Sequence, residues 1–261
     1  MKLDYRYYKT IDSTNLEIKR LYAQGAKEGT VASAGTQTAG RGRTGHRWES
    51  PRDVSVATSL LLTPPADLPM EKLPGLTILA AMAVAKTIEE EYHLTCEIKW
   101  PNDILVGKRK ICGILTEMDA ANGSVNYVVV GIGVNVHQTK ADFVEEISDM
   151  ATSLDMELQK EHGEDKRASR RTIIRGIWEN FLSYYQDFLR YQGSLEGIRE
   201  DYNLHLVNRN KRVKIMDPAG EYEAKAVGME ADGSLAILMD DGTKRCVDSG
   251  EVHVRGLYGY V

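Results

Sequence analysis

The spacing of apolar residues along the chain predicts four helices. Apolar residues recur at helical spacing over residues 16–25, 73–92 and 167–191, and a further helical stretch covers 194–205. The first of these helices follows Asp12-Ser13-Thr14-Asn15, residue types that cap helix N-termini, and ends near Gly25. The stretch 167–191 carries a broad apolar face, which is typical of an amphipathic helix.

Runs of β-branched and other apolar residues predict strands in two groups. The first group covers residues 30–36, 54–62, 97–100, 110–118 and 124–135, with Asn122-Gly123 as the hairpin turn between the last two. The second group follows a polar stretch at 208–211 and covers 213–216, 221–229, 235–239, 244–247 and 252–255. Short strands this close together, over about fifty residues, suggest a small barrel. We therefore predict two domains, 1–208 and 209–261.

Composition narrows the class of protein. The chain has a net charge of -5 and is 42% hydrophobic and 27% charged, which is ordinary for a globular protein and unlike a general nucleic-acid binder. No segment approaches the roughly 18–20 consecutive apolar residues of a membrane span, and the N-terminus has no apolar signal core. The three cysteines, Cys96, Cys112 and Cys246, form no metal-binding pattern, so we expect no zinc site and a reducing cytoplasm.

The arginine loop, residues 40–48, is the first candidate site. It contains three glycines and three arginines, and it connects two predicted strands. Glycine lets a backbone approach a ligand closely, and arginine presents a planar fork to a carboxylate or phosphate. The loop therefore favours anion binding. A solvated basic turn and a nucleic-acid contact are the alternatives, and Trp48 is either a lid residue or a core residue.

Two further motifs lie downstream of this loop. In the first, Trp100-Pro101 fixes the exit of a strand, Asn102 and Asp103 brace the turn, and Lys110 opens the next strand. A lysine beside such a turn is either a phosphate-binding group or a solvated surface residue. In the second, glycines alternate along the apolar strand 131–136, so that a flat group can lie against one face. Taken alone, the second motif favours tight packing of the strand on a helix.

Taken together, these motifs resemble those of bacterial biotin protein ligases, also called biotin–[acetyl-CoA-carboxylase] ligases. The resemblance covers the chain to about residue 205, and the terminal barrel is similar to the family's SH3-like domain. The motifs that carry the resemblance, in chain order, are Ser13-Thr14-Asn15, Gln37–Trp48, Lys99–Asp103, Lys110–Gly113 and Gly131–Asn135. It implies an α+β fold, with a mixed sheet flanked by helices, like a class II synthetase, followed by the SH3-like barrel.

The resemblance also implies a reaction. Biotin and ATP give biotinyl-5′-AMP and pyrophosphate, with Mg²⁺ carried largely by the nucleotide and no metal site of the protein's own. The biotinyl group then passes to a lysine of a biotin carboxyl carrier domain. By motif position, the residues implied to bind biotin are Ser13, Thr14, Asn15, Gln37, Arg41, Gly42, Arg43, Lys110, Gly113 and Gly131. Those implied to bind ATP or the adenylate are Arg41, Arg43, Trp48, Asn102, Lys110 and Asn135.

Within that set, Lys110 and Arg43 are the implied catalytic residues. Lys110 is expected to bridge the biotin carboxylate and the α-phosphate, and Arg43 to hold the adenylate under the arginine loop. Gly113 and Gly131 are expected to floor the biotin slot. Asp103 is expected to orient Lys110 or the accepting lysine. His46 stands where the family's loop often carries arginine or lysine, and its neutral imidazole contributes little charge at pH 7.

The resemblance has consequences for partners as well. The Asp-Ser-Thr-Asn motif starts at residue 12, without the helix-turn-helix that precedes it in many relatives, so we expect no DNA-operator binding. We expect the carrier domain as partner, no nucleic acid, no membrane, and a possible homodimer, since relatives often pair through their sheets. The alternatives are a lipoate or octanoate ligase or transferase of related fold, and a nucleic-acid-binding module.

Overall fold

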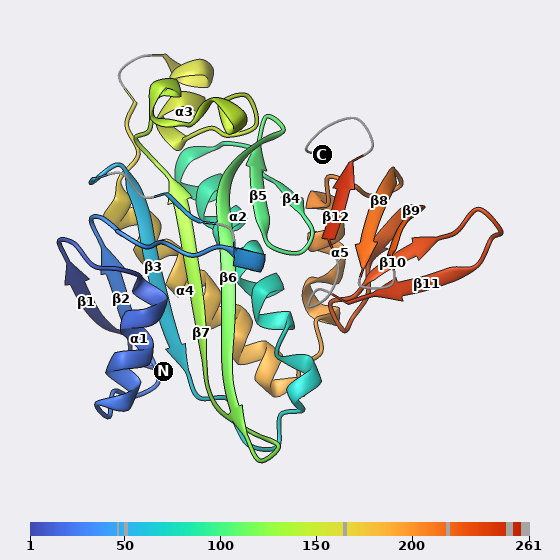
Figure 1. The fold of residues 1–261 in the computed structure, drawn as a ribbon, viewed down its shortest axis with the longest axis horizontal. Coiled ribbons are helices and arrows are strands. Elements are labelled where there is room, and N and C mark those ends of the chain that lie inside the picture. Colours follow the sequence, from blue (N-terminus) through green and yellow to red (C-terminus); the bar gives the residue numbers. More distant parts are fainter. Residues whose placement is uncertain (46, 50–51, 164–165, 218–219, 249–252, 257–261) are drawn as a thin grey trace.

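A mixed seven-stranded sheet forms the centre of the molecule (Figure 1). The computed structural model describes residues 1–45, 47–49, 52–163, 166–217, 220–248 and 253–256. The order of the strands is β1-β2-β3-β7-β6-β5-β4, and only β1 and β2 pair in parallel. The bounds of the strands are β1 Asp4–Tyr8, β2 Thr30–Ala34, β3 Ser55–Leu62, β4 Glu97–Lys99, β5 Asp103–Val106, β6 Arg109–Ala121 and β7 Ser124–Asn135.

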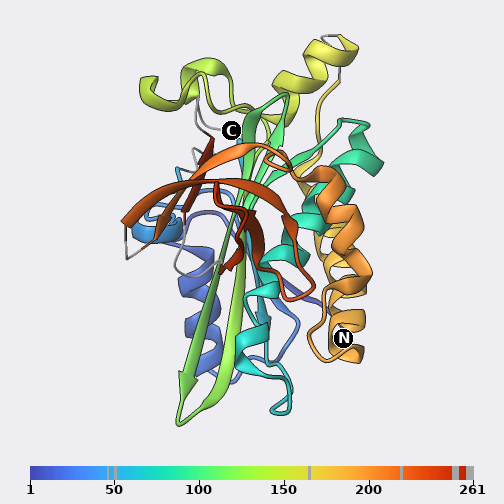
Figure 2. The same ribbon diagram turned by 90° about the vertical axis from the view of Figure 1, so that its right-hand side faces the viewer.

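Helices cover both faces of this sheet. Figure 2 shows α1 on one side, with α2 and α4 on the other. The bounds of the helices are α1 Thr14–Ala23, α2 Gly75–Tyr92, α3 Leu154–His162, α4 Arg170–Arg190 and α5 Glu196–His205. The predicted mixed sheet with flanking helices is therefore confirmed. None of the helices that the structure describes is long and apolar enough to cross a membrane.

Strand β3 is buried on both faces because α1 packs on one of its faces and the core with α2 and α4 lies on the other. Val56 and Leu60 pack in the large core that α2 and α4 share, whereas Leu61 packs with Ile18 and Leu21 of α1. Side chains alternate between the faces of a strand, so Ser59 shares the α1 face with Leu61. The α1 face is the one that carries the site described below.

A second sheet follows the last helix. It contains β8 Arg212–Asp217, β9 Gly220–Met229, β10 Leu235–Leu238, β11 Lys244–Val247 and β12 His253–Gly256, all antiparallel, in the order β11-β10-β9-β8-β12. This is the small C-terminal β unit expected from the sequence. No pairing of β11 with β12 that would close it into a barrel is present in the described part of the chain.

Polar contacts of Asn203 and Trp100 help to hold the second sheet against the rest of the molecule. The Asn203 side chain on α5 accepts a hydrogen bond from Met229 N at 2.7 Å and donates one to Met229 O at 3.0 Å. Trp100 donates from Nε1 to Gly233 O at 3.0 Å. Because Trp100 directly precedes the Pro101-Asn102-Asp103 turn, this contact also connects the second sheet to the site.

Candidate active site

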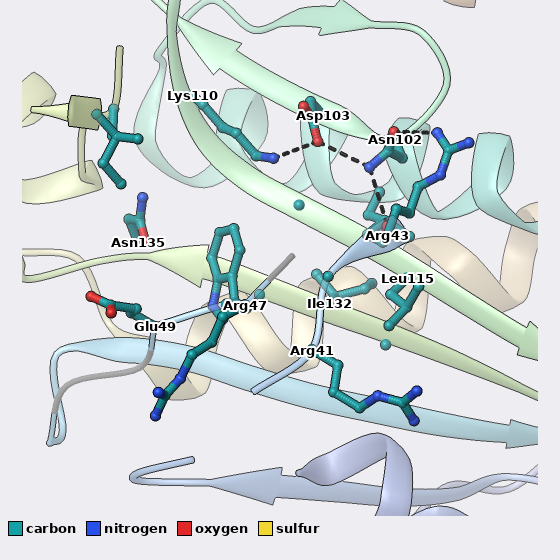
Figure 3. Close-up of a pocket in the computed structure, with 18 of the residues that line it drawn as sticks. Arg41, Arg43, Arg47, Glu49, Asn102, Asp103, Lys110, Leu115, Ile132 and Asn135 are labelled. Atoms are coloured by element: carbon teal, nitrogen blue, oxygen red, sulfur yellow. Dashed lines mark hydrogen bonds and ion pairs between the residues drawn. The ribbon is translucent and has the colours of Figure 1, made fainter. Parts of the chain in front are cut away.

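A cavity of about 630 Å³ lies on the α1 face of the central sheet, and side chains from widely separated parts of the sequence point into it (Figure 3). The strand register explains why they meet. Asp103 pairs with Gly113, which pairs with Gly133, while Leu115 and Ser59 both pair with Gly131. These two rows are two residues apart, so they share one face of the sheet.

The cavity collects all of the predicted site residues. They are Ser13, Thr14, Asn15, Gln37, Arg41, Gly42, Arg43, Trp48, Asn102, Asp103, Lys110, Gly113, Gly131 and Asn135. Further residues complete the lining, and among them are Gln138, Phe143, Ile147, Met150 and Val254 of β12. His46 lies outside the described residues.

One end of the cavity is a buried polar cluster at the start of α1. Gln37 Oε1 accepts hydrogen bonds from Thr14 N at 2.8 Å and from Thr14 Oγ1 at 3.0 Å. Ser59 Oγ lies 2.7 Å from Thr14 Oγ1 and 2.6 Å from Asn15 Oδ1. Buried polar groups are costly unless hydrogen-bonded, so this cluster is held in one arrangement. It suits a small polar head group.

The other end carries the positive charge. Lys110 Nζ lies 2.7 Å from Asp103 Oδ1. Asn102 Nδ2 donates to the same carboxylate oxygen at 3.0 Å, and Arg43 donates from NH1 to Asn102 Oδ1 at 2.9 Å. Dashed lines in Figure 3 mark these contacts between the four side chains. Burial lowers the pKa of Arg43, and the charge of Asp103 opposes that shift.

The strand around Lys110 is held by the segment that follows β7. Lys110 N donates to Met150 O at 2.7 Å, and Thr152 N donates to Lys110 O at 2.9 Å. Asn135 Nδ2 donates to Thr152 O at 3.0 Å, and Gln138 Nε2 donates to Asn135 Oδ1 at 2.9 Å. The backbone of Lys110 is thus fixed, so the long side chain alone decides where the ammonium lies.

The glycines of β6 and β7 leave room for two side chains. A Cβ on Gly133 would lie 2.4 Å from the Trp48 indole, and one on Gly113 would lie 3.0 Å from it. A Cβ on Gly131 would lie 2.0 Å from Asn15 Oδ1. The flat group expected against these strands is therefore the Trp48 ring, with Lys110 Nζ 5.7 Å from its centroid. That Gly113 and Gly131 floor a biotin slot stays a prediction.

The arginines of the arginine loop have different partners. Arg41 NH1 donates to Glu117 Oε1 at 3.1 Å, and Arg47 NH2 donates to Thr38 O at 2.9 Å. Arg43 alone reaches the Asp103 end of the cavity. Among the three, Arg43 is therefore the one joined to the Lys110–Asp103 pair, through Asn102.

Some residues of the site were absent from the sequence-based prediction. Phe143, Ile147 and Met150 supply apolar lining from the segment after β7, where the sequence pattern is weak. Ser59 and Glu117 lie behind the lining, and both belong to predicted strands. An alternating strand indicates which residues share a face, but not which hydroxyl or carboxylate on that face meets a helix cap.

Comparison with known proteins places this geometry in a family. The model of the biotin/lipoate A/B protein ligase family matches residues 7–135, and that of the biotin protein ligase C-terminal domain matches residues 210–255. The bifunctional ligase/repressor BirA of Bacillus subtilis (strain 168) is 37% identical, over 92% of this chain and 70% of its own length.

The chain belongs to the biotin protein ligase family. Another member, the biotin–[acetyl-CoA-carboxylase] ligase of Mycobacterium tuberculosis, is 28% identical over 91% of this chain and 80% of its own. The structure of the Aquifex aeolicus biotin protein ligase in complex with biotin and ATP superposes with a TM-score of 0.81, at 26% identity, over 97% of this chain and 99% of that one. The family resemblance predicted from the motifs is confirmed.

Proposed function

We propose that the protein joins biotin to ATP to form biotinyl-5′-AMP, and then transfers the biotinyl group to a lysine of the biotin carboxyl carrier domain of a carboxylase. The observation that carries this proposal is the layout of the cavity. A polar cluster at the start of α1 lies at one end, and Lys110 and Arg43 lie at the other. Biotin, with a polar ring at one end and a carboxylate at the other, matches this layout.

The first step joins two anions, so it requires local positive charge. A carboxylate oxygen of biotin attacks the α-phosphorus of ATP, and pyrophosphate leaves. Lys110 Nζ is the group we assign to both the carboxylate and the α-phosphate, where it offsets their repulsion and the charge that develops in the transition state. Arg43 lies next in line through Asn102 and Asp103, and we assign it to the adenylate phosphate.

We assign adenine to the space beside Trp48. The indole lies against Gly113 and Gly133, and Phe143, Ile147 and Met150 also line the cavity. Trp48 Nε1 is buried against Gly133 and has no hydrogen-bond acceptor among the described residues. Asn135 is fixed by Thr152 and Gln138, and we assign it to the ribose or phosphate side.

The second step needs no side-chain nucleophile. The carrier lysine attacks the biotinyl carbonyl of the mixed anhydride, and AMP leaves. The task of the protein is to hold the adenylate and exclude water until the carrier docks. The arginine loop covers the cavity and suits this task. Asp103 is placed to orient Lys110, its partner in the structure.

Mg²⁺ would be held mainly by the phosphates of ATP. No group of three potential metal ligands of the His, Cys, Asp or Glu type occurs in the described part of the chain. Of the carboxylates that line the cavity, that of Asp103 already accepts from Lys110 and Asn102. The ion would supply further neutralisation of the phosphates. The residues of this chain that approach the phosphates in our assignment are Lys110, Arg43 and Asn135.

A direct test of the proposed function is ATP–pyrophosphate exchange with the purified protein. We expect biotin to drive exchange, and lipoate and octanoate to fail. A streptavidin blot after incubation with ATP, biotin and a carrier domain tests the second step. If lipoate alone drove exchange, the protein would be a lipoate ligase and the proposed function would be wrong.

We further propose that the protein acts in the cytoplasm and that two copies pair through strand β1. This strand is one of the two edge strands of the sheet, and its Tyr5 and Tyr7 side chains are 48% and 63% exposed. Sedimentation of the wild type against Tyr7→Lys tests the pairing, because a charge on an edge strand opposes strand addition. Identical monomeric sedimentation of both would contradict it.

A further inference from the structure

Glu117 on β6 does not line the cavity, yet it holds three side chains at its edge. Its Oε2 accepts a hydrogen bond from Asn15 Nδ2 at 2.8 Å. Its Oε1 accepts from Lys19 Nζ at 2.8 Å and from Arg41 NH1 at 3.1 Å. Asn15 and Lys19 belong to α1, and Arg41 belongs to the arginine loop. One carboxylate therefore joins the start of α1, at one end of the cavity, to the arginine loop.

The carboxylate of Glu117 is ionised at neutral pH. Burial alone would raise its pKa, but the hydrogen bonds from Lys19 and Asn15 and the charges of Lys19 and Arg41 lower it below its ordinary value. Only 17% of the side chain is exposed. A carboxylate in this state accepts hydrogen bonds and donates none.

This acceptor fixes the orientation of the Asn15 amide. Asn15 Nδ2 donates to Glu117 Oε2 and, at 3.3 Å, to Leu115 O. Both partners are pure acceptors, so the NH₂ group must face them, and Oδ1 must face Ser59. Asn15 Oδ1 then accepts the hydroxyl proton of Ser59 over 2.6 Å. Reversal of the amide would place Oδ1 against the Glu117 carboxylate.

The orientation of the Asn15 amide determines whether Thr14 Oγ1 can accept a hydrogen bond from a ligand. A serine hydroxyl has one proton, and that of Ser59 is committed to Asn15. Thr14 Oγ1, 2.7 Å from Ser59 Oγ, therefore receives no proton from it, and its own proton points to Ser59 or to Gln37. Thr14 lines the cavity, and its oxygen keeps lone pairs for a donor there. When the Thr14 proton points to Ser59, the chain of donors runs from Thr14 to Glu117, and the negative end of such a chain strengthens the acceptor at the other end.

We propose that Glu117 is a positioning residue, which orients Asn15 so that Thr14 Oγ1 accepts an N–H from the ureido ring of biotin, and which anchors Arg41 of the arginine loop. This inference rests on the proposed function, since it names the group of biotin that the cluster recognises. Glu117 acts through Asn15, Ser59 and Arg41 and touches no substrate. Glu117 thereby couples recognition of the biotin head group by the polar cluster at the start of α1 to the position of the arginine loop.

The test is Glu117→Gln, a substitution of nearly the same shape. The new amide can turn an NH₂ toward Asn15, which releases the amide orientation, and it loses the charge that holds Arg41. We expect KM for biotin in pyrophosphate exchange to rise by about tenfold or more, the scale for one charge-assisted hydrogen bond. KM for ATP should stay within about twofold, and biotinyl-AMP should dissociate faster.

Asp119→Asn is the matched control. Asp119 lies two residues along β6 on the same face and accepts from Asn126 Nδ2 at 2.6 Å at the exposed end of the hairpin. The control should leave both KM values and the dissociation rate unchanged. Ser59→Ala is a second test variant, which removes the proton link without a change of charge. It should raise KM for biotin and leave Arg41 in place.

Three outcomes would overturn the inference. They are a wild-type KM for biotin in both Glu117→Gln and Ser59→Ala, equal rises in KM for biotin and for ATP, and the same effects in Asp119→Asn. Failure of Glu117→Gln to fold leaves Ser59→Ala to decide. Failure of the proposed function is distinguishable, because the wild-type protein would then show no biotin-dependent exchange at all.

Discussion

Lys110 and Asp103 form an ion pair at the centre of the site, with Nζ and Oδ1 2.7 Å apart. The two residues are diagonal neighbours across β5 and β6, since Asp103 pairs with Gly113 and Lys110 pairs with Leu105. Their side chains are 27% and 13% exposed. Asp103 thus keeps the ammonium at the mouth of the cavity, where two substrate anions would compete for it.

We expect Lys110→Ala to suppress adenylate formation by more than about 100-fold, the scale for loss of one contact to a developing transition-state charge. The backbone of Lys110 is held by Met150 and Thr152, so the strand should stay in place. Single-turnover release of pyrophosphate measures the effect. Near-normal release would remove Lys110 from the chemistry.

Asp103→Asn is the control for this prediction. It keeps the shape of the side chain and removes the counter-charge, so Lys110 should lose the ion pair that orients its ammonium. We expect a loss of adenylate formation smaller than that of Lys110→Ala. An equal loss would mean that the pair, and not the lysine, stabilises the transition state.

Arg43→Gly is expected to change retention of the intermediate more than its formation. Arg43 is joined to Asp103 through Asn102, and Lys110 contacts Asp103 directly. Loss of the guanidinium should speed release of biotinyl-AMP by roughly 10- to 100-fold, the range for a charge-assisted hydrogen bond. A filter-binding chase of radiolabelled adenylate measures it. Arg52→Gly, which removes an exposed arginine that does not line the cavity, is the control.

The larger elements of the fold were predictable because their patterns are long. The apolar face over 167–191 corresponds to α4, and the runs at 54–62 and 124–135 correspond to β3 and β7. Strand β1 was missed, because its tyrosines face solvent at a sheet edge and give little apolar signal. Helix α3 was missed for the same reason, since its sequence LDMELQKEH is mostly polar. The domain boundary near 208–211 stays a prediction.

The site was predictable as a set of motifs but not as an arrangement. Spacing along the chain indicates that Gly113 and Gly133 leave a face bare, yet it does not reveal that Trp48 folds back over them. That contact depends on the path of the arginine loop. The role of Glu117 was equally hidden, because an acidic residue near the exposed end of a strand is usually solvated.

The cysteines permit a test of the buried side of β6. Cys96 and Cys112 are buried, and burial raises the pKa of both thiols above the ordinary value. The thiolate is the nucleophile, so both should be inert to iodoacetamide at pH 8. Cys246 is exposed and should react. Intact-mass measurement should give one label on the native protein and three in denaturant. Rapid labelling of Cys112 would contradict the packing described.

The contact of the Trp48 indole with Gly113 of β6 and Gly133 of β7 leads to the last prediction. A methyl group at position 133 would lie 2.4 Å from Cε2 of the indole, so Gly133→Ala must displace the ring. Overpacking of this kind typically lowers the free energy of unfolding by about 1–3 kcal/mol. Here the arginine loop, which carries Trp48, can move aside without a change in the packing of the core. We therefore expect a small change in melting temperature and a large rise in KM for ATP.

Gly197→Ala is the control, since no atom lies within 4 Å of a Cβ at that position on α5. Alanine also has the higher helix propensity, so this variant should be at least as stable as the wild type. If Trp48 covers adenine, Trp48→Ala should raise KM for ATP by a similar factor, and the double variant Gly133→Ala/Trp48→Ala should add little to either. Full additivity would show that the methyl group acts elsewhere, because two changes that remove one contact cannot each remove it again.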